Sequence, residues 1–151
     1  MVKSYRDLDV WKRANAAVLD VYRVTNLFPR SEQFGVVSQL GRTAYSIRAN
    51  TAEGFGRRST KELLQFLAVA NGSLQELQYF LSLSRDLRYL SPADLEKLEM
   101  DLTAVAQMIS ALAKSFRLRL ADATARAASS YASRNTGHVA RTTKTSSEGL
   151  H

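Results

Sequence analysis

The strongest helix signal in the chain lies in residues 91–116, which read SPADLEKLEMDLTAVAQMISALAKSF. Ser91 is a typical N-cap, Pro92 suits the first helical position, and Asp94 places negative charge at the positive end of the helix dipole. The apolar residues that follow alternate in steps of three and four, as in the seam of a helical bundle. They are Leu95, Leu98, Leu102, Val105, Ile109, Leu112 and Phe116. The stretch predicts a long amphipathic helix.

A second helix is predicted to start at Ser59, before this stretch in the chain, and to run to about Tyr89. Ser59 and Glu62 have the spacing of a capping box, in which each residue satisfies an unpaired group of the first helical turn. The apolar stripe that follows is wide enough to face a bundle core. It consists of Leu63, Phe66, Leu67, Ala70, Leu74, Leu77 and Leu81.

Two more helices are predicted nearer the N-terminus. One runs from Asp7, as N-cap, to Leu27 before Pro29, and the other runs from about Ser31 to Gly54. The first stripe comprises Trp11, Ala14, Val18, Val21, Tyr22 and Thr25. The second comprises Phe34, Val37, Gly41, Ala44, Tyr45 and Ala52, and Gly54 and Gly56 are interpreted as its stop signal.

The short joints between these segments force neighbouring helices to be antiparallel. The predicted fold is therefore an all-α, up-down-up-down four-helix bundle over residues 1–120. In residues 121–151 large apolar side chains almost vanish and Ser and Thr abound, so we expect helix to about Ala128 and disorder beyond Ser133. Additional apolar arcs favour assembly as a homo-oligomer. Their members are Val36, Leu40 and Ile47 on one helix, and Tyr79 and Leu83 on another.

Composition narrows the function. The chain of 151 residues has no Cys, and its two His fall near the C-terminus, which argues against thiolate or histidine catalysis and against Cys- or His-bound metal. Nucleotide loops and hydrolase motifs are absent from the sequence. With no signal peptide and no apolar run near the ~18 residues that span a bilayer, we expect a soluble cytoplasmic protein, not an enzyme, that has no cofactor and no membrane partner.

The formal charge of +7 favours an anionic partner. Arginine presents a flat donor fork that suits phosphate oxygens, and basic residues gather near the joint between the second and third helices. The candidate nucleic-acid-binding residues are Arg42, Arg48, Arg57, Arg58 and Lys61. The alternative is that Arg57 and Arg58 only keep a solvated turn soluble. Arg48 is unusual because it falls within the predicted apolar stripe.

A polar face of the second helix has two interpretations. It could bind a ligand, or Asn50 and Glu53 could hydrogen-bond to Ser73 and Glu76 of the third helix or to a neighbouring chain and so fix the register. We favour the structural role. A hydrolase that uses Glu53 and Glu76 is kept as an alternative for testing. Trp11 beside Lys12 is more typical of core packing than of single-strand binding.

Three motifs in this order carry a resemblance to a known family. They are Tyr5 to Trp11 (YRDLDVW), Ser46 to Arg57 (SIRANTAEGFGR) and Asn71 to Leu77 (NGSLQEL). The chain resembles the four-helix-bundle proteins encoded in intervening sequences of bacterial 23S rRNA, the S23 proteins, which are similar to the accessory variability proteins of diversity-generating retroelements. Arg48 and Thr51 depart from the family pattern, which has Pro and Ile there.

The resemblance implies a homopentamer with a basic surface or channel, without catalytic activity. It also implies RNA or another nucleic acid as partner, together with a reverse transcriptase. Two hypotheses follow for this chain. The first is an oligomeric helical bundle that binds nucleic acid through basic residues, and the second is a protein-interaction scaffold without nucleic-acid binding.

Overall fold

The computed structural model describes the backbone of residues 4–142 and the side chains of residues 4–135. Every regular element in this part of the chain is a helix, so the predicted all-α class with four long helices is confirmed. Two short 3-10 helices are η1 (Tyr5–Asp7) and η2 (Arg30–Glu32). The α-helices are α1 (Asp9–Thr25), α2 (Val36–Phe55), α3 (Thr60–Asp86) and α4 (Pro92–Thr142). The chain divides into two compact units between Lys114 and Ser115.

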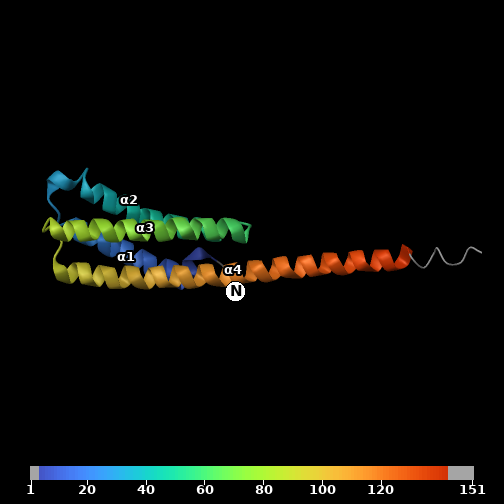
Figure 1. Ribbon diagram of the computed structural model, residues 1–151. Helices are drawn as coiled ribbons and strands as arrows, with labels where there is room; N and C mark the ends of the chain where they lie inside the picture. Colours follow the sequence, from blue (N-terminus) through green and yellow to red (C-terminus); the bar gives the residue numbers. More distant parts are fainter. Residues whose placement is uncertain (1–3, 143–151) are drawn as a thin grey trace, which may run out of the picture. The chain divides into compact units, whose positions relative to one another are not determined.

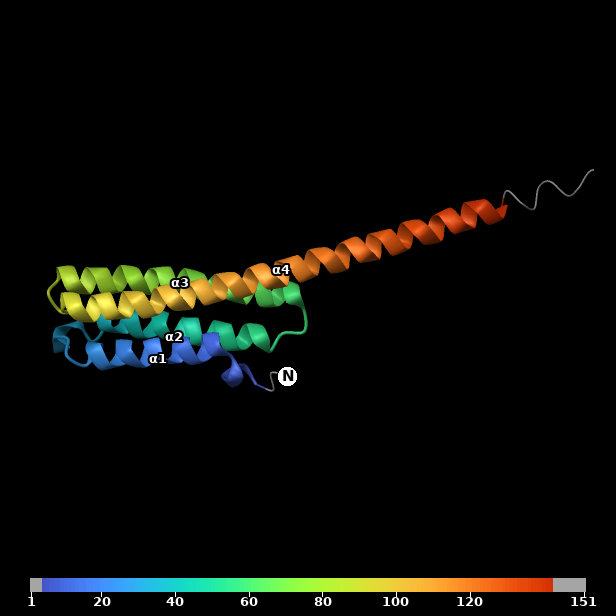
Figure 2. The ribbon, with the colours of Figure 1, turned by 90° about the horizontal axis from the view of Figure 1, so that it is seen from below.

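Successive helices of the first unit are antiparallel, as Figure 1 and Figure 2 show. Helix α2 packs against both α1 and α3. Two ion pairs link α1 with α4: Lys97 Nζ lies 2.7 Å from Asp20 Oδ2, and the Arg13 guanidinium lies 3.6 Å from Asp101. Helix α2 thus lies against α1 and α3, and α1 is also held to α4.

The core of the first unit consists mainly of Leu, Val and Ala side chains. The predicted stripe of α3 is confirmed except at Phe66, which is half-buried. The stripe of α4 is confirmed from Leu95 to Ile109, and in the next turn Ala113 is buried where Leu112 was expected. Removing this apolar surface from water, worth about 25 cal/mol per Å², is the main stabilising contribution.

The buried face of α2 differs from the prediction. Phe34 precedes the helix and is 91% exposed, and Tyr45 is 65% exposed. The buried residues are Val36, Leu40, Thr43, Ala44, Ile47, Thr51 and Gly54. The arc with Leu40 and Ile47, expected to serve self-association, is therefore the core face. The physical reason is that the other arc would bury the hydroxyl of Tyr45 and the guanidinium of Arg48, which is costly without partners.

Thr43 and Thr51 are fully buried polar residues on this core face. The Thr51 hydroxyl donates to the Ile47 carbonyl at 2.7 Å, and the Thr43 hydroxyl donates to the Gln39 carbonyl. Bonding back to the preceding turn satisfies both hydroxyls and lets them pack among aliphatic side chains. Thr51 can therefore lie on the buried face of α2.

Two helix starts were predicted incorrectly. Asp7 is not the N-cap of α1; it belongs to η1, where its carboxylate accepts the Ser4 N–H at 3.0 Å, and α1 starts after Leu8. Helix α2 starts at Val36, whose N–H donates to the Glu32 carboxylate at 3.2 Å. Helix α1 has no side-chain cap at Leu8, and the cap of α2 comes from Glu32, one turn before the helix. Sequence spacing alone did not single out either start.

The starts of α3 and α4 are confirmed. Ser59 Oγ accepts the N–H of Glu62 at 3.1 Å, and Ser91 Oγ accepts the N–H of Asp94 at 3.1 Å. Helix α3 ends at Asp86, earlier than expected, because Arg88 turns the chain with a left-handed φ of 63°.

The second unit begins at Ser115 within α4. We expected the helix to end near Ala128, but it continues to Thr142. Alanine recurs between Ala121 and Ala132 and has the highest helix propensity, so this segment is helical although the side chains of residues 117–135 are exposed. The predicted disorder of residues 143–151 concerns residues outside the described part. The predicted domain boundary at residue 120 stays a prediction.

Candidate nucleic-acid interface

The joint between α2 and α3 is built around a close helix approach at Gly54. A Cβ atom at this glycine would lie 2.9 Å from Phe66 Cβ and 3.2 Å from Leu63 Cδ1. Gly54 is buried inside α2, which ends one residue later at Phe55. Of the two glycines predicted to stop the helix, Gly54 lies inside it and Gly56 is its C-cap, so the prediction is confirmed for Gly56 alone. The missing side chain of Gly54 allows α2 and α3 to pack closely where the candidate site lies.

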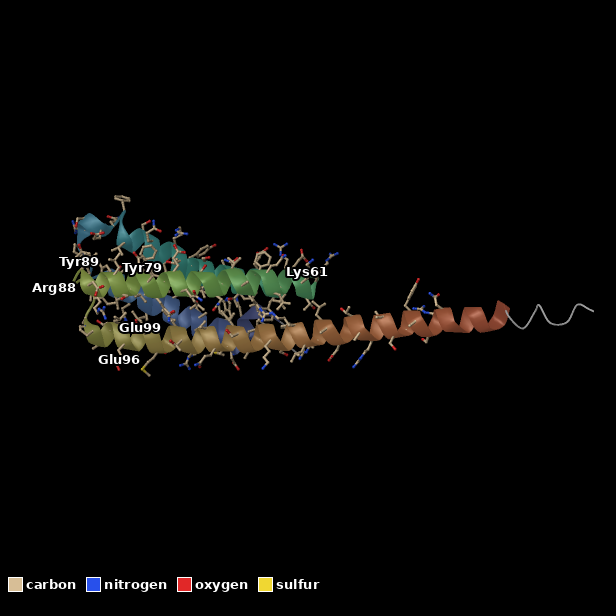
Figure 3. The ribbon with its side chains drawn as sticks, in the orientation of Figure 1. Lys61, Tyr79, Arg88, Tyr89, Glu96 and Glu99 are labelled. Carbon is tan, nitrogen blue, oxygen red and sulfur yellow. The ribbon has the colours of Figure 1, made fainter. Side chains whose placement is uncertain are left out.

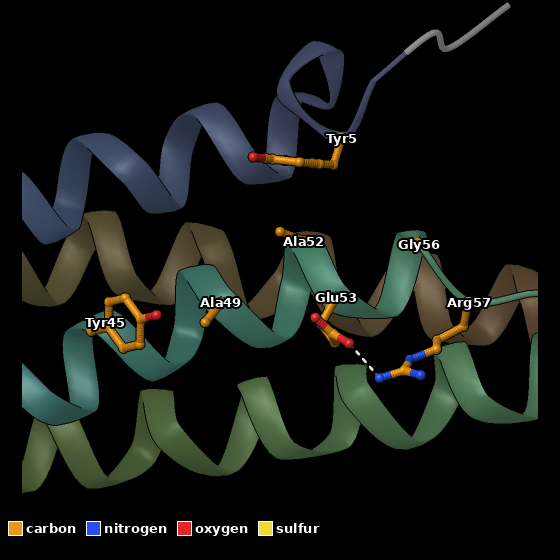
Figure 4. A pocket seen from close by; sticks show the side chains of 7 residues that line it. All are labelled: Tyr5, Tyr45, Ala49, Ala52, Glu53, Gly56 and Arg57. Atoms are coloured by element: carbon orange, nitrogen blue, oxygen red, sulfur yellow. Dashed lines mark hydrogen bonds and ion pairs between the residues drawn. The ribbon is translucent and has the colours of Figure 1, made fainter.

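A surface hollow of about 480 Å³ lies beside this joint. Figure 4 shows that one lining side chain comes from η1 and the others from α2 and the turn after it. The lining residues are Tyr5, Tyr45, Ala49, Ala52, Glu53, Gly56 and Arg57. We call this feature the Tyr5–Tyr45 hollow. Between Tyr45 and Glu53, the α2 part of the lining consists of the small residues Ala49 and Ala52.

Arg57 is held in place at the edge of the Tyr5–Tyr45 hollow. Its guanidinium pairs with the Glu53 carboxylate, one helical turn earlier, and stacks on Phe66 with its carbon 4.8 Å from the ring centroid. The dashed line in Figure 4 marks the pair with Glu53. Because a carboxylate offsets its charge, Arg57 contributes a fixed donor fork more than a net positive charge.

Next to the Tyr5–Tyr45 hollow, two aromatic rings that contact each other are each covered by an arginine. Arg48 lies over the Trp11 ring at 5.4 Å, Trp11 meets Tyr5 edge to face at 5.3 Å, and Arg6 lies over Tyr5 at 5.2 Å. We call these four residues the aromatic–arginine cluster. Arg48 on the partly exposed face of α2 is thus explained by stacking on Trp11. Trp11 itself is half-buried and serves the cluster as well as the core.

Arg58 and Lys61 differ from the other basic candidates. Both are exposed, and neither forms a hydrogen bond or an ion pair with another residue in the described ranges. Arg42, in contrast, binds Glu76 at 2.8 Å and Gln39 at 2.9 Å. It also lies about 20 Å along the helix axis from the end of α2. The five basic candidates therefore do not form one patch, and the uncompensated charge lies at Arg58 and Lys61.

The polar face of α2 faces α3, with pairings that partly differ from the expectation. The Asn50 amide donates to the Ser46 carbonyl at 2.8 Å and to Ser46 Oγ at 3.0 Å, and Ser46 Oγ lies 2.8 Å from Ser73 Oγ. Asn50 thus reaches Ser73 through Ser46. Glu53 and Glu76 do not join this network, because each binds an arginine of α2 or its C-terminal turn instead.

An apolar strip is exposed along α3. Tyr79 is 63% exposed and meets Phe80 edge to face at 5.3 Å, and Leu83 is half-buried. Val69 lies on the same face of the helix and is exposed, and Leu87, the C-cap directly after the helix, is also exposed. Figure 3 shows Tyr79 on α3 between Lys61 and Arg88, which mark the two ends of that helix. We call Val69, Tyr79, Leu83 and Leu87 the α3 strip.

Sequence reasoning missed the functional position of Tyr45. Its place in an apparent apolar stripe suggested the core, whereas Tyr45 is exposed and lines the Tyr5–Tyr45 hollow. The signal that could have revealed this was Arg48 three residues later, since a cation is disfavoured on a buried face.

Among the described residues, no group of three or more His, Asp or Glu is placed to hold a metal ion. None of the described helices has the length and apolarity needed to cross a membrane.

Comparisons with known proteins identify a matching family and a similar solved structure. The family model described as "23S rRNA-intervening sequence protein" matches residues 6–111. A crystal structure of a protein of unknown function from the S23 ribosomal protein family of Bacteroides thetaiotaomicron VPI-5482 is similar, with a TM-score of 0.63 and 24% identity. The match covers 70% of this chain and 98% of that one. At this identity the similarity concerns the fold. No match was found among curated proteins.

Proposed function

Because the chain belongs to the 23S rRNA-intervening sequence protein family, we propose that it is a non-enzymatic cytoplasmic helical protein that binds RNA. The proposed contact surface is the end of the first unit where η1, the last turns of α2 and the start of α3 meet. The observation that carries the proposal is that two uncompensated cations, Arg58 and Lys61, immediately follow the Tyr5–Tyr45 hollow in the chain.

The charges of this surface suit a phosphate backbone. Binding a polyanion releases condensed counterions, so each cation that is free of a protein partner contributes to affinity. Arg58 and Lys61 meet this condition, whereas Arg42 and Arg57 already neutralise carboxylates. We therefore expect Arg58→Ala to weaken RNA binding more than Arg57→Ala. Arg48 and Arg6 add donors next to the half-buried rings of Trp11 and Tyr5, and arginine beside aromatic rings is a combination found where single strands bind.

The test is a salt series of RNA affinity, measured by fluorescence anisotropy with a short single-stranded RNA. Arg58→Ala/Lys61→Ala should lower affinity by about tenfold and reduce the slope of log K against log salt by about 1.4, which is two phosphate contacts. The matched control is Arg30→Ala/Arg88→Ala, which removes two exposed cations, one in η2 before α2 and one in the turn after α3. Figure 3 shows Arg88 at the opposite end of α3 from Lys61.

The control should keep the wild-type slope. Equal loss in both double variants would show that net charge alone attracts RNA. Wild-type affinity in Arg58→Ala/Lys61→Ala would place any RNA contact elsewhere. The hydrolase alternative is tested in the same samples, because cleavage of the RNA that disappears in Glu53→Gln would contradict a non-enzymatic role.

We also propose that the protein assembles with copies of itself through the α3 strip, with Tyr79 and Leu83 at the centre. Exposed aromatic and aliphatic side chains on one helix face are typical of contact surfaces. The resemblance to accessory variability proteins suggests a pentamer and a reverse transcriptase as a further partner. If the strip binds another protein instead, the chain is the interaction scaffold considered above.

A further inference from the structure

The chemistry of the Tyr5–Tyr45 hollow is unusual for a phosphate site. Its lining contains one carboxylate, Glu53, and one guanidinium, Arg57, which pair with each other. The charged groups in the lining therefore cancel, and the Glu53 carboxylate repels a phosphate placed inside. A ligand of the hollow is selected by shape and hydrogen bonding more than by negative charge.

The remaining features suit a flat, polar ring. Tyr45 is 65% exposed, so a large part of its side chain is free for contact with a ligand. Tyr5 is fixed between Trp11 and Arg6, which holds its ring in place at the other side of the hollow. Aromatic side chains of this kind stack with nucleic-acid bases regardless of their sequence.

The hydrogen-bonding edge of a base carries donors and acceptors, and the hollow offers an acceptor and a donor to match them. Glu53 accepts hydrogen bonds, and the Arg57 guanidinium, stacked on Phe66, donates them. Adenine, cytosine and guanine carry an exocyclic amine that a carboxylate can accept from, whereas uracil has none. The hollow is also large enough, at about 480 Å³, for a base and its sugar.

We propose that the Tyr5–Tyr45 hollow is a subsite for one unpaired nucleotide, with the base stacked on the tyrosines and its edge at Glu53 and Arg57. This inference rests on the proposed function and makes it specific. The preferred ligand is a single strand, because a paired base cannot offer its face or its pairing edge. Phosphates of the strand then lie outside the hollow, where Arg58 and Lys61 are uncompensated.

The experiment uses Trp11, the single tryptophan of the chain, as reporter, since it touches Tyr5 at the border of the hollow. The full chain is titrated with adenosine 5′-monophosphate, uridine 5′-monophosphate, adenosine and inorganic phosphate while Trp11 emission is recorded. Adenosine and its monophosphate should change the emission saturably. Uridine 5′-monophosphate should bind several-fold more weakly, and phosphate alone should leave the emission unchanged.

Three tyrosine variants separate stacking from folding. Tyr45→Ala should weaken binding of adenosine 5′-monophosphate by about fivefold or more, the loss expected for one stacked base. Tyr45→Phe keeps the ring and should stay within about twofold of wild type. Tyr131→Ala is the matched control, because Tyr131 is 67% exposed and belongs to the second unit. A circular dichroism melt of each variant checks the fold.

A second arm compares an unpaired RNA with the same sequence in a duplex. The inference requires tighter binding of the unpaired strand, and a preference that shrinks in Tyr45→Ala. Equal affinities with a normal salt slope would overturn the inference and leave RNA binding intact. Nucleotide binding without binding of either RNA would overturn the proposed function and make the hollow a site for a free nucleotide. A phosphate response equal to that of adenosine 5′-monophosphate would overturn the inference, because it would show an anion site.

Discussion

Individual residues at the α2–α3 joint combine two roles, since they hold the helices together and form the candidate site. Glu53 fixes Arg57, Arg57 covers Phe66, and Gly54 lets Phe66 come close. The Glu53–Arg57 pair follows the i,i+4 charge pattern, whereas the contacts at Phe66 come from the packing of α2 on α3. The site therefore depends on a helix separation that a single methyl group would change.

Gly54→Ala is expected to destabilise the protein by about 1–3 kcal/mol, because the added Cβ would lie 2.9 Å from Phe66 Cβ and the helices would have to separate. Gly72→Ala is the matched control within a helix. No atom lies within 4 Å of a Cβ at Gly72, so this change should stabilise by about 0.5–1 kcal/mol through helix propensity. Urea unfolding at one protein concentration measures both. A stabilising Gly54→Ala would contradict the close approach.

Among the helices, the sequence predicted the start and the buried face correctly where it contained one clear apolar stripe and one clear N-cap. The long apolar seams and serine caps of α3 and α4 are in the structure as predicted. Helix α2 was rotated in the prediction, because two arcs have similar apolar content and the cost of burying Tyr45 and Arg48 was not weighed between them. Its cap, Glu32, lies before the helix and also accepts a hydrogen bond from Tyr89, 57 residues later.

The part of the candidate site that is local in sequence could be predicted, and the part that depends on contacts between helices could not. Arg57, Arg58 and Lys61 could be grouped because they are close in sequence. The contacts of Arg48 with Trp11 and of Arg42 with Glu76 join different helices, and spacing along the chain carries no information about them. Tyr5 and Tyr45 come together only when η1 folds beside α2.

The link between α1 and α4 predicts a pH dependence. The Lys97 hydrogen bond and Arg23 hold the pKa of Asp20 below its ordinary value of 3.8. Because the unfolded chain has the ordinary pKa, this stabilisation is complete above that value and is lost as the pH falls through the lower, folded-state pKa. Asp20→Asn should therefore lose less thermal stability than wild type on acidification. Glu99→Gln, which removes an exposed carboxylate, should follow wild type in the same melts, and identical curves for all three would contradict the role of Asp20.

At the scale of the whole molecule, the α3 strip predicts assembly. Tyr79→Asp/Leu83→Asp should place two charges on this apolar surface and lower the mass measured by light scattering after size exclusion. Tyr131→Asp, an equally exposed tyrosine of the second unit, should leave the mass unchanged. A wild-type protein that runs as a monomer at high concentration would contradict self-association through the strip.

We propose that RNA contacts the Tyr5–Tyr45 hollow, the aromatic–arginine cluster, and Arg58 with Lys61. Ultraviolet cross-linking of the full chain to a single-stranded RNA, followed by mass spectrometry of the cross-linked peptides, tests it most directly. The account predicts cross-links at Tyr5, Trp11 or Tyr45 that weaken as salt is raised. Cross-links confined to Tyr79 or Tyr131, or none at low salt, would contradict it.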